Sequence, residues 1–146
     1  MVPVAVQIGD NDGKAHVRIE VVRYEHPEIA EPAGMDLLHC RVHASAPPVK
    51  AAFPLSIRVE EFLALRDYLR EINSGNGPQA TFAIADGLFN LSFAPSRRGP
   101  VLVAVQLKSI ESSHVRLEYL VTLEPESISR AIADLAALEA SVSSSR

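Results

Sequence analysis

The chain has 146 residues, of which 47% are hydrophobic and 22% are charged, and its formal net charge is −4. This length closes one hydrophobic core and is too short for two ordinary domains, and the composition excludes a wholly disordered chain. The acidic balance excludes nucleic-acid binding through many phosphate contacts, which requires clustered lysines and arginines.

The N-terminal residues predict a β-hairpin. Residues 2–8 alternate as a short strand does, and the glycines and Asx residues at 9–13 predict a turn. Residues 15–24 alternate again, which indicates a strand with one face in solvent. Two prolines predict a loop over 25–34. The first strand fits pairing within the chain and pairing with another subunit equally well.

Two further strands and a helix follow. Residues 36–45 and 49–57 alternate on either side of Pro47-Pro48, and Pro54 places the second of these strands at a sheet edge or strand end. The period then changes to 3.6, which predicts an amphipathic helix over 59–73 that stops at the glycines and proline of residues 75–78. Its apolar stripe is Phe62, Leu65, Leu69 and Ile72.

The next segment predicts a four-stranded meander. Centring the first hairpin on Asp86-Gly87 pairs Ile84 with Phe89 and Phe82 with Leu91. Centring the second on Arg97 and the third on Glu111 puts the alternating apolar residues of all four strands on one face. The pairs predicted for these two hairpins are Phe93 with Val101, Leu91 with Val103, Phe89 with Val105, Leu107 with Val115, Val105 with Leu117 and Val103 with Tyr119.

A second helix begins at Pro125, where a proline at the first helical position and nearby acids mark a helix start. Its apolar stripe runs from Ile128 to Leu138, and residues 141–146 are expected to fray. The predicted fold is α+β, an antiparallel, meander-like β-sheet with two helices packed on one face. It forms a single domain over residues 1–146, in which about 1–13 are the N-terminal strand and turn.

The stretch HCRVH holds the only cysteine and two of the five histidines. In a strand, Cys40 points away from His39, Arg41 and His43, and the two histidines are roughly 13 Å apart, too far to share one zinc ion. A metal site would require ligands from another strand or subunit. Cys40 lies among apolar positions and has no cationic neighbour that would activate it, which predicts a buried, inert thiol.

No other motif predicts catalysis. The chain has no glycine-rich phosphate loop, paired-histidine metalloprotease motif or Gly-x-Ser-x-Gly elbow. Glu60 and Glu61 are adjacent in a helix and point about 100° apart, as on a solvated face. The prediction is a protein without catalytic residues, metal or cofactor. An enzyme would require a histidine, His16, His39, His43 or His114, to meet a carboxylate across strands.

The outer face of the sheet is the candidate partner-binding surface. The predicted register sets Leu102 beside Leu120, an apolar spot on a polar surface. Scattered apolar residues on an ordinary surface are the alternative. The candidate residues are His39, Arg41, His43, Leu102, Arg116, Glu118 and Leu120.

A single cysteine and the lack of a basic n-region followed by a long apolar segment predict a cytoplasmic protein. No run approaches the roughly 20 apolar residues of a membrane span, so neither membrane nor nucleic acid is an expected partner.

The order of these segments resembles a known family. The strands MDLLHCRVHA and VKAAFPLSIRVEEF, the helix end LRDYLREI, and the segments ATFAIADGLFNLSF, VLVAVQLKS and VRLEYLVTLEPESI resemble the WapI-type immunity proteins and related bacterial domains over roughly residues 15–140. The resemblance implies a small protein that neutralises a cognate polymorphic toxin by binding it and that catalyses no reaction. The alternative is a homo-oligomeric, for example dimeric, or small-ligand-binding α+β module.

Overall fold

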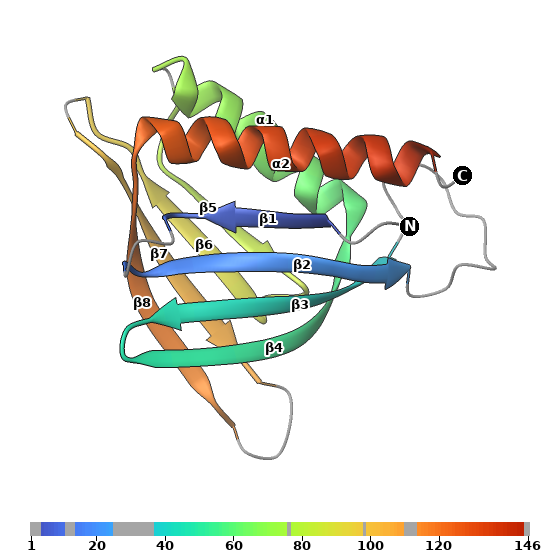
Figure 1. The fold of residues 1–146 in the computed structure, drawn as a ribbon. Coiled ribbons are helices and arrows are strands. Elements are labelled where there is room, and N and C mark those ends of the chain that lie inside the picture. Colours follow the sequence, from blue (N-terminus) through green and yellow to red (C-terminus); the bar gives the residue numbers. More distant parts are fainter. Residues whose placement is uncertain are drawn as a thin grey trace.

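The computed structural model describes residues 4–10, 14–24, 37–75, 77–97, 99–109 and 114–144 (Figure 1). The loop predicted over 25–34, residues 11–13 of the first turn and residues 145–146 of the predicted tail lie outside these ranges.

The first four strands form one antiparallel sheet, sheet A, in the order β1-β2-β3-β4. The predicted N-terminal hairpin is confirmed, because β1 pairs with β2 of its own chain, with Ile8 opposite Val17. β4 is at the edge of the sheet, as Pro54 predicts. The strands of sheet A are β1 (Val4–Ile8), β2 (His16–Tyr24), β3 (Leu37–Ala46) and β4 (Val49–Arg58).

The helix α1 (Val59–Asn73) follows β4 directly, as the change of period predicts. Its apolar stripe of Phe62, Leu65, Leu69 and Ile72 is buried. The chain leaves the helix through Gly75, whose φ of +89° suits a residue without a side chain.

The last four strands form a second antiparallel sheet, sheet B, in the order β5-β6-β7-β8. In the first hairpin, Ile84 pairs with Phe89 and Phe82 with Leu91, as predicted from the Asp86-Gly87 turn. The strands of sheet B are β5 (Ala80–Ile84), β6 (Phe89–Ala94), β7 (Val101–Lys108) and β8 (Arg116–Leu123).

The predicted registers of the second and third hairpins are wrong by two residues. Phe93 lies opposite Val103 instead of Val101. Val105 lies opposite Tyr119 instead of Leu117. A shift of two keeps every side chain on its face, so the buried pattern is unaffected. The loops after β6 and β7 are longer than the Asp86-Gly87 turn, and a long loop does not fix the register of the strands that it joins.

The second helix, α2 (Pro125–Ser144), begins at the predicted proline. It continues past residue 141, where the sequence predicts fraying. Val142 is buried against the core, and this apolar contact extends the ordered helix by one turn.

The α+β class is confirmed, with antiparallel strands and helices packed against them, and the strands are divided between two sheets. Buried residues of both sheets and both helices form one core cluster. Figure 1 shows the strands of the two sheets crossing steeply, with the helices along one side. There α2 packs against β1 and α1. Tyr119 joins the sheets on another side, because its hydroxyl donates to the carbonyl oxygen of His16, 2.8 Å away.

Candidate protein-binding surfaces

The seven residues assigned to one partner-binding face lie on two different sheets. Because both sheets turn their apolar side chains to the shared core, their outer faces point away from each other. The prediction of one common surface is therefore wrong, since alternation shows which side chains of a strand share a face and not which strands share a sheet. Sheet A carries His39, Arg41 and His43, and sheet B carries Leu102, Arg116, Glu118 and Leu120.

The outer face of sheet A is mostly basic. Arg18 lies opposite His43 and Glu20 opposite Arg41. His43 Nε2 is 3.2 Å from Glu20 Oε1. This hydrogen bond, followed by the positive charges of His43, Arg18 and Arg41, holds the pKa of the Glu20 carboxyl below its usual value. The one carboxylate among these residues thus already has a partner.

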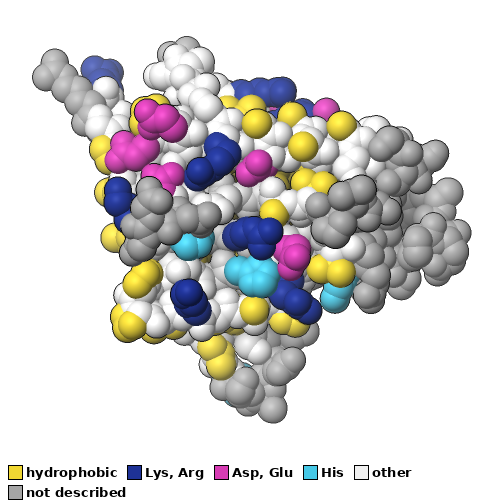
Figure 2. Space-filling view, in the orientation of Figure 1, with side chains coloured by type: hydrophobic (Ala, Val, Ile, Leu, Met, Phe, Trp, Pro, Cys, Tyr) yellow, Lys and Arg dark blue, Asp and Glu magenta, His cyan; other side chains and the backbone are white. Residues whose placement is uncertain are grey.

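A shallow hollow of about 510 Å³ lies on this face. Side chains of three strands line it, with His16 and Arg18 from β2, His43 from β3 and Lys50 from β4. Figure 2 shows dark blue and cyan side chains over this part of the molecule, whereas most of the magenta side chains in this view lie above, toward α2. The hollow is therefore lined by positive or protonatable groups.

Cys40 lies on the opposite side of β3 from these residues. Its side chain is fully buried, and its thiol is 3.6 Å from the carbonyl oxygen of Leu38. The predicted burial of this thiol is confirmed. In the part of the chain that the structure describes, no group of three or more His, Cys, Asp or Glu side chains could hold a metal ion.

The outer face of sheet B carries a row of hydrogen bonds across three strands. Asn90 donates to Gln106 Oε1 (3.0 Å), and Gln106 donates to Glu118 Oε1 (2.5 Å). Arg116 Nη2 donates to the same Glu118 oxygen at 2.6 Å. These contacts, led by that of Gln106, keep the pKa of Glu118 below its usual value. The row is held in place by its own contacts, with Arg116 and Glu118 exposed and Asn90 and Gln106 half-buried.

Apolar side chains lie beside this row. Leu120 is 65% exposed and Leu102 is 46% exposed. The two were expected directly opposite each other, which is wrong because of the two-residue register shift: Ala104 lies opposite Leu120, and Thr122 opposite Leu102. Leu102 and Leu120 nevertheless line the same hollow of about 530 Å³.

This hollow adjoins a larger one of about 760 Å³ that extends over the polar row. The two hollows share Thr81, Ser92, Ala104 and Leu120. The outer face of sheet B is therefore recessed over parts of all four strands and combines exposed leucines with fixed polar groups.

Sequence reasoning missed four residues of these faces: Arg18, Lys50, Asn90 and Gln106. Arg18, Asn90 and Gln106 each stand between two buried residues, and Lys50 stands between two apolar residues, Val49 and Ala51, so the outward direction of all four could have been predicted from the pattern. The cross-strand partners of these residues could not be predicted. The register between β2 and β3 is set across a long connection, and the register between β7 and β8 is set across a loop.

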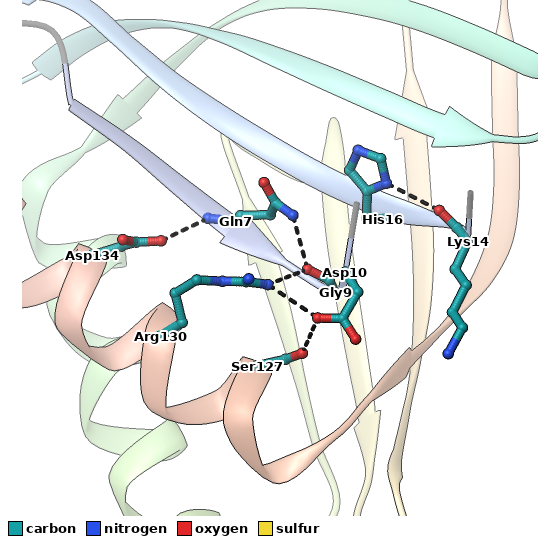
Figure 3. A network of polar contacts seen from close by, with 8 residues as sticks. All are labelled: Gln7, Gly9, Asp10, Lys14, His16, Ser127, Arg130 and Asp134. Atoms are coloured by element: carbon teal, nitrogen blue, oxygen red, sulfur yellow. Dashed lines mark hydrogen bonds and ion pairs between the residues drawn. The ribbon is translucent and has the colours of Figure 1, made fainter. Parts of the chain in front are cut away.

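A third group of polar contacts connects α2 to the first hairpin and is structural (Figure 3). Asp10 Oδ1 accepts hydrogen bonds from Ser127 Oγ (2.6 Å) and from Arg130 Nη2 (3.2 Å). Arg130 also donates to the carbonyl oxygen of Gly9, at 2.8 Å. Ser127 is almost fully buried, so Asp10 supplies the partner that its hydroxyl needs away from water, whereas the side chains of Arg130 and Asp10 are themselves partly exposed.

Among the described helices, none is both long and apolar enough to cross a membrane. The fold and its two outer faces define a small α+β protein whose candidate sites are open, shallow surfaces.

Comparison with known proteins shows to which family this small α+β protein belongs. A family model described as the immunity protein WapI-like family matches residues 7–142. The chain belongs to this WapI-like family of immunity proteins, as its resemblance to the family predicts. Searches of curated proteins and of solved structures gave no match.

Proposed function

We propose that the protein neutralises a cognate polymorphic toxin by binding it, and that it does so in the cytoplasm without catalysing a reaction. The observation that supports this function best is the family match over residues 7–142, nearly the whole chain. A single cysteine, held as a buried thiol, suits a reducing compartment.

We further propose that the toxin binds to the outer face of sheet B, through Leu102, Arg116, Glu118 and Leu120. Large apolar side chains that are exposed inside a recessed surface are typical of the centre of an interface, where they lose their contact with water on binding. A stable complex commonly buries about 800 Å² on each partner, so we expect the contact to extend beyond these four residues over the rest of this face.

The polar row supports the same choice of surface. Because Asn90, Gln106, Arg116 and Glu118 already hold one another in place, little side-chain entropy remains to be lost when a partner binds. The arrangement suits inhibition by occlusion, in which a fixed surface covers the toxin's own site.

Affinity capture from the native cells, followed by mass spectrometry, would identify the toxin domain. That domain is then co-expressed with the protein under separate promoters, and growth is measured. We expect wild type to restore growth and Leu120→Arg to restore much less, because a charge would be buried at the centre of the interface.

Val49→Arg is the matched control, since Val49 is 48% exposed and lies on β4 of the other sheet. It should protect as wild type does. Equal protection by both variants would overturn the choice of surface and keep the function. Failure of wild type to protect, with only a dimer of the protein recovered by capture, would replace the proposed function by a self-associating module.

A further inference from the structure

We propose that the outer face of sheet A is a second docking surface, which binds an acidic surface of another protein. This proposal goes beyond toxin neutralisation and does not depend on it. It assigns a role to His39, Arg41 and His43, which the two-sheet fold separates from the outer face of sheet B.

The first support is the sign of the charge. Arg18, Arg41 and Lys50 are exposed on this face, and among the residues of these strands that the structure describes Glu20 is the carboxylate that lies beside them. The chain as a whole carries a net charge of −4, and its helices hold seven acidic residues against three basic ones. The outer face of sheet A is thus opposite in sign to the rest of the molecule, so a partner's acidic surface would be attracted to this face and repelled by the helices.

The second support is the shape of the face. His16, Arg18, His43 and Lys50 stand around a hollow whose remaining lining is three alanines and Ser45. Such short side chains leave room for a partner's carboxylates to approach the basic groups from three strands at once. Arginine in particular binds carboxylates through two parallel hydrogen bonds.

The partner is a protein and not a nucleic acid. Phosphate-driven binding uses about 6–10 cationic contacts along an extended polyanion. A long polyanion that followed this face would extend toward the acidic helices. A compact acidic surface of ordinary interface size would stay on the basic residues.

The position of the face makes the two sites independent. The outer faces of sheets A and B point away from each other. A partner on the outer face of sheet A would therefore leave the outer face of sheet B open, and one molecule could hold both partners at the same time.

The test uses the full chain and a fluorescent poly-L-glutamate peptide as the probe, with binding followed by anisotropy at low ionic strength. We expect saturable binding that weakens as salt is added, because exposed charges are screened. The double variant Arg18→Glu/Arg41→Glu should bind roughly tenfold more weakly, from two reversed contacts.

The matched control is Arg70→Glu/Arg97→Glu, which changes the net charge equally at two exposed positions outside this face. It should retain binding within about threefold, since only long-range attraction changes. Thermal unfolding of both variants verifies that they fold. Absence of binding, or equal loss in the two variants, would overturn the proposal. Tighter binding to a duplex DNA of equal charge would do so as well.

Discussion

Asp10 shows how one carboxylate joins two distant segments. It sits just after β1 and receives hydrogen bonds from Ser127 and Arg130 of α2. These bonds, led by that of Ser127, lower the pKa of the Asp10 carboxyl, so the folded state favours its charged form. Neither contact could be predicted from the sequence, because the residues are more than a hundred positions apart.

Asp10→Asn should therefore lower the melting temperature at pH 7. A carboxyl whose pKa falls on folding stabilises the folded state above its unfolded pKa of about 3.9, and this contribution is lost as the pH falls through the lower, folded value. The gap between wild type and variant should be largest at neutral pH and close in strong acid. Asp86→Asn, which removes one carboxylate from an exposed turn outside this contact, is the control for the loss of charge and should lower the melting temperature at pH 7 less than Asp10→Asn does. A gap that did not change with pH would contradict the assignment.

Gly9 is required for two separate reasons. Its φ is +100°, and a Cβ at this position would lie 2.7 Å from Val121 Cγ1 of sheet B. Gly87 shares the positive φ but has open space around it. Gly9→Ala should thus reduce the free energy of unfolding by about 1–3 kcal/mol more than Gly87→Ala, because only the former adds a clash. Equal losses in chemical denaturation would show that the sheets do not approach each other at this point.

At the scale of elements, Glu61 fixes the start of α1 to the end of β5. Its two carboxylate oxygens accept backbone N–H groups, that of Arg58 at 2.8 Å and that of Ala85 at 3.1 Å. Ala85 is buried, so its amide would lose its partner in Glu61→Ala, at a cost of about 1–3 kcal/mol. The neighbouring Glu60 is exposed, and Glu60→Ala should cost less than about 0.5 kcal/mol in the same denaturation series. Equal effects would contradict a linking role for Glu61.

The edges of the sheets are protected in different ways. The helix α2 covers β1. Asp134 of α2 accepts a hydrogen bond from the backbone N–H of Gln7, at 3.2 Å. The edge strand β4 instead carries Pro54, which has no amide to offer a neighbouring chain. Pro54→Thr should increase self-association, measured by sedimentation. The control is Ala52→Thr, two residues earlier on the same strand. Ala52 already has a backbone N–H, so this substitution should leave self-association unchanged. If both variants remained monomeric, Pro54 would not be the residue that protects this edge.

The elements themselves were largely predictable. The alternation of apolar and polar residues predicted the strands, the change to a period of 3.6 predicted α1, and Pro125 predicted the start of α2. Each of these signals lies within the element itself and is therefore local. Register was predictable only where the connection is tight. The Asp86-Gly87 turn determined the pairing of Ile84 with Phe89, whereas the longer loops after β6 and β7 left an error of two residues.

On the scale of the whole molecule, the division into two sheets could not be predicted. Strands of one sheet and strands of two sheets that share a core show the same alternation of apolar and polar residues. The candidate surface therefore appeared as one group of seven residues, and the fold separated it into a basic face and a face with exposed leucines. The structure thus presents two open surfaces of different chemistry on opposite sides of one core.

The central claim is that the protein binds a toxin domain through the outer face of sheet B. The most direct test is titration calorimetry of the purified toxin domain against wild type, Leu120→Arg and Val49→Arg. The account predicts a tight complex for wild type and Val49→Arg, and a loss of at least about tenfold in affinity, or 1.4 kcal/mol, for Leu120→Arg. Equal affinity of all three proteins would contradict this claim.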